Sequence, residues 1–397
     1  MPWKQISVME QRREFVELAV VGEMSVRELC ARFGISRDTG HRLLRRYAEE
    51  GNAGLRDRSR RPHVSPSRTN AATEAAILEV RADHPAWGGR KIARRLRDLG
   101  WPEVPCASTV TEVLRRHGCL ADEREAARHR AFVRFERAEP NALWQMDFKG
   151  HFATERSRCH PLTVLDDHSR YALGLRACGD ETDRTVREQL AGLFRRYGLP
   201  DAMLADNGSP WGSAGHDVPY TGLGVWLLRL GVDLLHGRPR HPQTQGKDER
   251  FHRTLNVELL QGRRFRDLTD CQRQFDAWRG IYNRERPHEA LGLATPASRY
   301  RPSPRHFPET LPEPEYHQSD IIRRVNKDGY FAFKARKLKI SQAFRGLDIA
   351  LRPAVQDGIW NVFFAGTVVA QFDLRDDRTN LETVRHVPEH PSDMSPV

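Results

Sequence analysis

The stretch "LWQMDFKG" (143–150) decides the fold class, because its apolar residues recur at every second position. This period is typical of a β-strand with one buried face. Trp144, Met146 and Phe148 would share the buried face, and Asp147 would lie on the opposite one. A lone Asp in a strand is usually structural or solvated, so Asp147 gains meaning only from the residues that follow.

The segments after this strand predict a mixed sheet. "HPLTVLDDHSRYALGLRAC" (160–178) indicates two more strands around a turn near 168–169. The apolar residues of 186–197 recur with helical spacing, and Gly198 ends that helix. Three hairpin-linked strands followed by alternating helices and strands give the order βββαβαβα, so we expect an α/β core over 138–300.

A second acid lies at the end of a later strand. "DAMLADNGSPW" (201–211) predicts a short buried strand that runs into Asp206, and then a turn. A helix over 222–230 and a strand over 232–235 follow. Asp166 and Asp167 are competing acids, but they fall between the second and third strands, and we interpret them as a turn pair.

The third acid comes from "HPQTQGKDERFHRTL" (241–255), which places Glu249 on the first turn of a helix. At about 100° per residue, Glu249 falls on the same side as Arg253, away from the apolar stripe that contains Phe251 and Leu255. Open α/β sheets bind ligands at such strand ends. We therefore expect the three acids of the core to converge on one site.

Three converging carboxylates would repel one another and raise each other's pKa unless a cation lies between them. Mg²⁺ prefers oxygen ligands, and two such ions can activate an attacking oxygen and stabilise a leaving one. The pattern therefore predicts a phosphodiester-cleaving site with two Mg²⁺ ions, for which Mn²⁺ could substitute, and no small-molecule cofactor. The predicted catalytic residues and metal ligands are Asp147, Asp206 and Glu249.

Composition favours double-stranded DNA as the partner. The 397 residues carry a formal net charge of +11, and a strongly basic chain favours polyanions; a basic surface kept for solubility is the alternative. The six cysteines form no CxxC pair, so we expect reduced thiols and no zinc site. No run of about 18 apolar residues occurs, so we expect a cytoplasmic protein without a membrane contact.

The N-terminal region has the pattern of a helix-turn-helix module over 1–55. "SVRE" (25–28) is a capping box, Gly34 makes a turn, and Ser36 caps a second helix. In this motif the second helix reads the major groove; an ordinary helical bundle with a basic face is the alternative. The DNA-contact candidates on that helix are Arg37, His41, Arg42 and Arg45.

A second helical module is expected over 70–122, after a basic linker over 56–69. "TVTE" (109–112) predicts a capping box at the start of its third helix. A plain linker and a basic helical connector are the alternatives to DNA contact. The phosphate-contact candidates are Arg58, Arg60 and Arg61 in the linker, and Lys91, Arg94, Arg95 and Arg115 in the module.

The end of the chain predicts a separate all-β unit. A proline-rich linker covers 301–320. Short alternating apolar runs with turns at Asp328-Gly329 and Asp357-Gly358 predict a small β-barrel over 321–376. The remaining residues, 377–397, are expected to be a tail.

Four stretches together resemble one family. "WQMD", "ADNG", "HPQTQGKDERFHRTL" and "YNRERPHEALGLATPASRY" (282–300) are similar to the integrase-core transposases of bacterial insertion sequences, the IS481 and IS3 group. The resemblance implies an RNase H-like core with an Asp-Asp-Glu triad, an SH3-like C-terminal barrel and a nucleoid-associated bacterial protein. The Gly- and Pro-rich loop 208–222 makes the spacing between the second and third acids longer than in short family members.

The resemblance also implies the reaction: hydrolysis at the element's terminal inverted repeats, then strand transfer into target DNA. Asp147 would bridge both metals, and Asp206 and Glu249 would each hold one. Joining two ends implies at least a dimer on DNA. The candidates for positioning the DNA backbone are Gln245, Lys247, Arg250 and Arg253. Two other hypotheses stay open, a DNA-binding regulator without catalysis and an RNase H-like nuclease without strand transfer.

Overall fold

A computed structural model describes residues 7–58, 68–120, 135–212, 220–236 and 246–375, together with the backbone of 382–383 and 395–396. The chain divides into two compact units, 1–68 and 69–397, and each is described by itself. Three of the DNA-contact candidates, Arg60, Arg61 and Gln245, lie outside the described residues.

The first unit is helical, as expected. Its elements are α1 (Val8–Val21), α2 (Val26–Arg32), α3 (Arg37–Glu50) and η1 (Gly51–Leu55). The capping box at Ser25 is confirmed, and the Ser36 side chain caps α3 by accepting from the Thr39 amide. A Cβ at Gly40 would lie 2.4 Å from Cys30 Sγ, so only glycine lets α3 cross α2 this closely.

The second unit begins with three helices, α4 (Ala71–Asp83), α5 (Gly89–Asp98) and α6 (Ala107–Arg116), which share a core around Ile77, Ile92 and Val110. The predicted capping box at 109–112 is wrong. The helix begins earlier, after Cys106, and no side chain caps it. Glu112 cannot close the box because it pairs with Arg115 on the next turn of the same helix.

The core domain is built on a six-stranded mixed sheet. β4 pairs antiparallel with β2 and β5, whereas β6 pairs parallel with β2 and β7. The predicted order of strands and helices is found, with one short strand, β3, that the sequence did not predict. Its elements are β2 (Trp144–Phe148), β3 (Phe152–Ala153), β4 (Arg158–Asp166), β5 (Ala172–Cys178), α7 (Asp183–Tyr197), β6 (Ala202–Ala205), α8 (Gly222–Arg229), β7 (Asp233–His236), α9 (Gly246–Leu255) and α10 (Leu268–Arg284).

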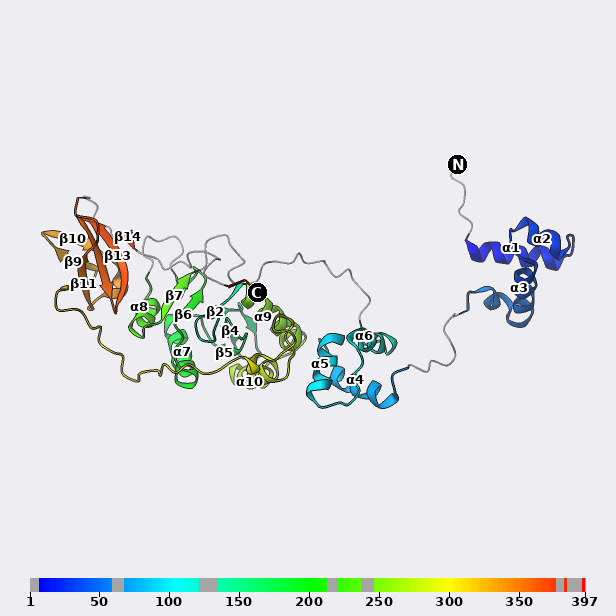
Figure 1. Ribbon diagram of the computed structural model, residues 1–397, viewed down its shortest axis with the longest axis horizontal. Coiled ribbons are helices and arrows are strands. Elements are labelled where there is room, and N and C mark those ends of the chain that lie inside the picture. Colours follow the sequence, from blue (N-terminus) through cyan, green and yellow to red (C-terminus); the bar gives the residue numbers. More distant parts are fainter. Residues whose placement is uncertain are drawn as a thin grey trace. The chain divides into compact units, whose positions relative to one another are not determined.

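Helices cover both faces of this sheet (Figure 1). Trp144 and Met146 pack with residues of α7 and α8 in one cluster of buried side chains. Phe251 and Leu255 of α9 pack with α10 and with the other face of β4 and β5. Because successive side chains of a strand point to opposite faces, Asp147 lies on the α9 side of β2. The alternation read from the sequence is confirmed.

The C-terminal domain has two small sheets. Five strands form one antiparallel sheet: β8 (Ile321–Arg324), β11 (Asp348–Pro353), β12 (Ile359–Phe364), β13 (Thr367–Asp373) and β14 (Glu382–Thr383). A separate hairpin pairs β9 (Tyr330–Phe333) with β10 (Arg336–Lys339). Both sheets contribute to one hydrophobic core.

The expected closed SH3-like barrel is not found within the described ranges. The strand order of the larger sheet leaves β8 and β14 as its edges, and β9 and β10 pair only with each other as strands. Between β8 and β9 the Arg323 side chain donates to the Ala332 carbonyl at 2.9 Å. Between β8 and β9 a side chain thus makes the contact, whereas closure of the barrel would need backbone hydrogen bonds there.

The remaining short elements are β1 (Phe135–Glu136), which pairs with β15 (Ser395–Pro396), and the helical turns η3 (Asn256–Leu260), η4 (Glu289–Leu291), η5 (Pro296–Ser298) and η6 (Gln342–Phe344). In the described part of the chain, no helix has the length and apolar character that a membrane crossing needs.

Candidate active site

The strand register brings the first two acids together. In the parallel pair of β2 and β6, Gln145 lies opposite Leu204. Two residues further along each strand come Asp147 and Asp206, and neighbouring strands lie about 4.8 Å apart. Asp206 follows the last residue of β6, where its carboxylate accepts from the Gly208 amide at 2.9 Å. The predicted turn after Asp206 thus orients this side chain.

The third acid is presented by α9. Phe251 and Leu255 are buried, as the helical wheel predicted, and hold the helix against β4 and β5. Glu249 is exposed on the first turn of the helix. It therefore extends from the N-terminal end of α9.

Electrostatics shows that the three acids share one neighbourhood. Burial, together with the charges of Asp206, Glu181 and Glu249, raises the pKa of Asp147 to about 7. The acids come from β2, from the end of β6 and from α9, and Glu181 from the turn before α7. The repulsion expected from converging carboxylates thus acts on Asp147.

The donor set suits a hard divalent cation, because it consists of carboxylate oxygens that repel one another in the absence of a positive charge. Among the residues that the structure describes, no three His, Cys, Asp or Glu side chains lie close enough to hold a metal ion as they stand. A bound cation would draw these carboxylates together by removing the repulsion between them. Asp147, Asp206 and Glu249 fit this role by the chemistry of their oxygen donors.

A neutral histidine flanks Asp147. Burial lowers the pKa of His252 to about 4. The Thr163 hydroxyl donates to the Asp147 carbonyl at 2.9 Å and lies 2.9 Å from His252 Nε2, which therefore carries the ring proton. The unprotonated Nδ1 then faces Asp147 Oδ2 at 3.9 Å. His252 thus adds a lone pair to the site and no charge.

Comparison with known families gives matches along most of the chain. Residues 137–242 and 230–296 match integrase core domains, and residues 320–380 match the C-terminal domain of IS481 family transposases. Residues 11–63 match a helix-turn-helix domain, and residues 39–114 a homeodomain-like domain. The chain is thus similar to the integrase-core transposases of insertion sequences over its core, its helix-turn-helix region and its C-terminal domain. The resemblance noted in the sequence is confirmed.

Similar proteins include two from insertion elements. The 39.2 kDa protein of IS476 from Xanthomonas euvesicatoria is 27% identical over 62% of this chain and 69% of its own length. The 31.7 kDa protein of IS407 from Burkholderia multivorans is 27% identical over 59% of this chain and 82% of its own length.

Two solved structures are also similar. A chain of the simian T-cell lymphotropic virus intasome, in complex with the PP2A regulatory subunit B56 gamma, is 15% identical, covers 76% of this chain and 100% of its own, and has a TM-score of 0.35. The HTLV-2 integrase catalytic core domain in complex with magnesium is also 15% identical, covers 41% and 97%, and has a TM-score of 0.31.

One acid of this transposase-family core was missed by sequence reasoning. Asp248 is 1% exposed, and neither of its carboxylate oxygens has a hydrogen-bond partner among the described residues. Burial raises its pKa well above the usual range, and the charge of Asp147 adds to the rise. A helical wheel of α9 could have predicted the burial of Asp248. Asp248 lies three residues before Phe251 and seven before Leu255, on the same buried stripe.

The acid pair at the β4–β5 turn has a structural role. Asp166 and Asp167 are 0% and 1% exposed; Asp166 ends β4 and Asp167 begins the turn that follows. Asp166 accepts from the Ser169 amide and from the Asn141 amide, both at 2.7 Å. Burial raises the pKa of Asp166 despite these bonds.

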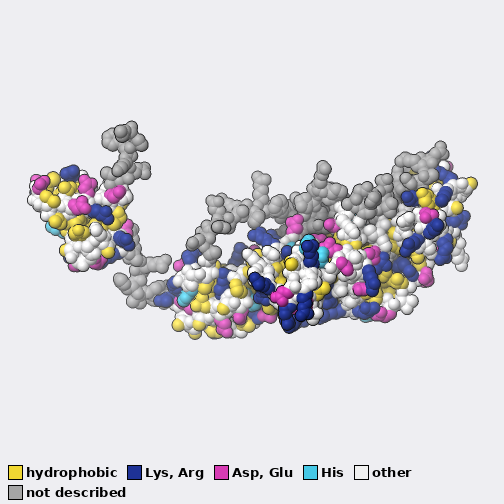
Figure 2. All heavy atoms as spheres, turned by 180° about the vertical axis from the view of Figure 1, so that it is seen from behind, with side chains coloured by type: hydrophobic (Ala, Val, Ile, Leu, Met, Phe, Trp, Pro, Cys, Tyr) yellow, Lys and Arg dark blue, Asp and Glu magenta, His cyan; other side chains and the backbone are white. Residues whose placement is uncertain are grey.

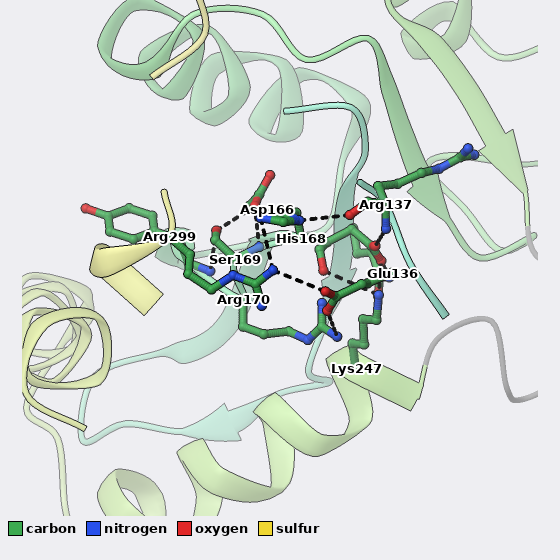
Figure 3. A network of polar contacts seen from close by, with 11 residues as sticks. Glu136, Arg137, Asp166, His168, Ser169, Arg170, Lys247 and Arg299 are labelled. Carbon is green, nitrogen blue, oxygen red and sulfur yellow. Dashed lines mark hydrogen bonds and ion pairs between the residues drawn. The ribbon is translucent and has the colours of Figure 1, made fainter. Parts of the chain in front are cut away.

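Two lysines predicted to contact DNA are half-buried. Lys247 does not extend to solvent, because its ammonium pairs with the buried carboxylate of Asp167 (Figure 3). Lys91 is half-buried, and burial together with the charge of Arg286 lowers its pKa to about 8. The ammonium of Lys247 is thus paired within its own chain, and a DNA contact of Lys91 stays a prediction.

The other DNA-contact candidates differ in solvent exposure and in whether they have an acidic partner. Arg37, His41, Arg42 and Arg45 are exposed on α3, and Arg250 and Arg253 on α9. Five of the candidates have acidic partners in the chain: Arg42 with Asp38, Arg58 with Glu50, Arg94 with Asp98, Arg95 with Glu285, and Arg115 with Glu112. Figure 2 shows Lys and Arg side chains gathered in the middle of one face of the second unit.

Proposed function

We propose that the protein is the DNA transposase of an insertion sequence. It binds the terminal inverted repeats of its element, hydrolyses a phosphodiester bond at each end and joins the ends to target DNA. The observation that supports this best is the raised pKa of Asp147, to which Asp206 and Glu249 both contribute. Carboxylates that repel across three separate elements are a cost to the fold unless a cation site uses them.

In this proposal Asp147, Asp206 and Glu249 would hold two divalent cations, which would supply Lewis-acid activation of the attacking oxygen and stabilise the leaving one. In the first step, water attacks the phosphorus and the P–O3′ bond breaks, which frees a 3′-OH. In the second, that 3′-OH attacks a target phosphodiester and releases a target 3′-OH. Arg250 and Arg253, exposed beside Glu249, hold the DNA backbone in line.

The proposed partner is double-stranded DNA, read by α3 in the major groove. Two ends must be joined in one event, so the proposal includes at least a dimer on DNA. Each protomer would then supply one set of carboxylates.

Strand transfer from pre-cleaved ends tests the proposal. The wild-type chain is expected to join such ends to target DNA in Mg²⁺ or Mn²⁺, and Asp206→Asn is expected to bind the ends but not join them. Binding without any cleavage in either metal would favour a DNA-binding regulator. Cleavage without a joined product would favour a nuclease.

Replacing Arg42 or Arg45 by Ala is expected to weaken binding to the terminal repeat by about tenfold or more, since a good base contact contributes roughly 1–3 kcal/mol. The measurement is fluorescence anisotropy with a labelled repeat duplex at one fixed salt concentration. The control is Arg301→Ala, which removes an exposed arginine paired with Glu139. Equal affinity of all three variants would contradict a reading role for α3.

A further inference from the structure

We propose that Asp167 is a positioning residue that ties the strand carrying Asp147 to the helix carrying Glu249. This inference rests on the proposed function, because it concerns how two of the three acids are held for cation binding. The sequence places Asp167 in a turn between strands, and its carboxylate is used by neither the sheet nor the family's triad.

The contacts of Asp167 link the two segments directly. One carboxylate oxygen, Oδ1, accepts from Gln145 Nε2 at 2.6 Å and pairs with the Lys247 ammonium. The Lys247 ammonium also lies 3.3 Å from the Asp167 carbonyl. Gln145 comes two residues before Asp147 on β2, and Lys247 comes two residues before Glu249 on α9. One carboxylate therefore joins both acid-bearing elements.

Burial makes this link a stiff one. The Asp167 side chain is 0% exposed and that of Lys247 19%. Burial lowers the pKa of Lys247 to about 8, although the charge of Asp167 opposes the shift. Water screens a pair in this position much less than a surface pair. Removing either partner would leave the other charge buried without a counter-charge. The pair is therefore strongly held in this geometry.

Further contacts hold Asp167 in place through the segment around Glu136 and Arg137, which Figure 3 shows together with His168, Arg170 and Arg299. The other oxygen of Asp167, Oδ2, accepts from the Arg137 amide at 2.8 Å, and the Arg137 carbonyl lies 2.9 Å from His168 Nδ1. The neighbouring Glu136 accepts from Arg170 at 3.0 Å and from Arg299 at 3.2 Å. The segment that leads into β2 is thus bonded to the turn between β4 and β5, so the two move together.

The arrangement matters because a metal site must hold its ligands within about 0.5 Å of the productive geometry. Groups that orient metal ligands typically contribute 10- to 100-fold to metal affinity. Without Asp167, the first turn of α9 keeps its apolar contacts through Phe251 but loses its polar tie to β2. Glu249 would then be free to move relative to Asp147.

The test compares full-length variants by the amount of Mn²⁺ they bind, followed as loss of the free-ion electron paramagnetic resonance signal, and by strand transfer over a series of Mn²⁺ concentrations. Asp167→Asn removes the charge, and combining it with Lys247→Met removes both charges and avoids a stranded ammonium. Lys247→Arg keeps the cation. Asn283→Leu is the control, since Asn283 is also buried and bonds the backbone of Ala172 on β5 from α10.

We expect Asp167→Asn, alone and with Lys247→Met, to weaken Mn²⁺ binding about tenfold or more, and high Mn²⁺ to restore part of the strand transfer. Lys247→Arg should keep near wild-type affinity. Asn283→Leu should lower the unfolding temperature and leave Mn²⁺ affinity unchanged. Unchanged affinity in the folded double variant would overturn the positioning role. Failure of the wild-type chain to bind Mn²⁺ would instead overturn the proposed function.

Discussion

Asp147→Asn is expected to lower end cleavage and strand transfer by at least about 10³-fold and, at the same time, to stabilise the metal-free protein. Activity is lost because Asp147 is the proposed metal ligand whose pKa the charges of Asp206 and Glu249 raise. Metal-ion catalysis supplies several kcal/mol of transition-state stabilisation. The gain follows because a neutral amide removes the repulsion at a half-buried position. We expect a gain of about 2 kcal/mol at pH 8.

Both effects can be measured on one protein preparation. Activity is measured as strand transfer of pre-cleaved ends, and stability as thermal unfolding in the presence of a chelator. Asp270→Asn is a control of opposite sign. Asp270 accepts from the Arg266 amide, which lowers its pKa, so its replacement should reduce stability and keep strand transfer. An Asp147→Asn protein that joins DNA at a normal rate would refute the catalytic assignment.

Mn²⁺ binding is expected to weaken as pH falls below about 7, with a slope that approaches tenfold per pH unit, which amounts to about 50-fold between pH 7 and pH 5. The reason is that metal ligands must be deprotonated and that Asp147 holds its proton up to a pKa of about 7. The measurement is the Mn²⁺ dissociation constant over this pH range. A dissociation constant that stays flat between pH 5 and pH 7 would contradict the raised pKa.

The same shift predicts how metal-free stability changes with pH. An acid whose pKa is higher in the folded state than in the unfolded state binds more protons when folded, so stability falls as pH rises from about 4 to about 7. Thermal unfolding in a chelator should show this fall in the wild-type chain. Asp147→Asn should reduce its slope, whereas the control Asp270→Asn should not.

Much of the core was predictable because its signals are local. The period of two in residues 144–148 and the period of a helix in residues 251–259 each depend only on neighbours along the chain, and both elements form as expected. The ends of α2 and α7 were predictable for the same reason, since a capping serine and a terminal glycine act within one turn. These elements carry two of the three acids.

The partners of individual side chains were not predictable from local signals. Lys247 follows a turn and precedes Glu249, so a phosphate contact was reasonable until the fold brought Asp167 to it across 80 positions of sequence. Lys91 was expected on an open face, and residues near 286 lie close to it. The C-terminal strands form, but the way their edges meet depends on contacts such as that of Arg323.

By itself, the sequence determined which elements form, which face of each is apolar, and which three acids stand at the ends of core elements. Hydrophobic periodicity and capping act over a few residues and need no knowledge of the rest of the chain. Only the tertiary structure decided which charges meet. Burial, and with it the pKa of Asp147 and the pairing of Lys247, is set by side chains that arrive from distant elements.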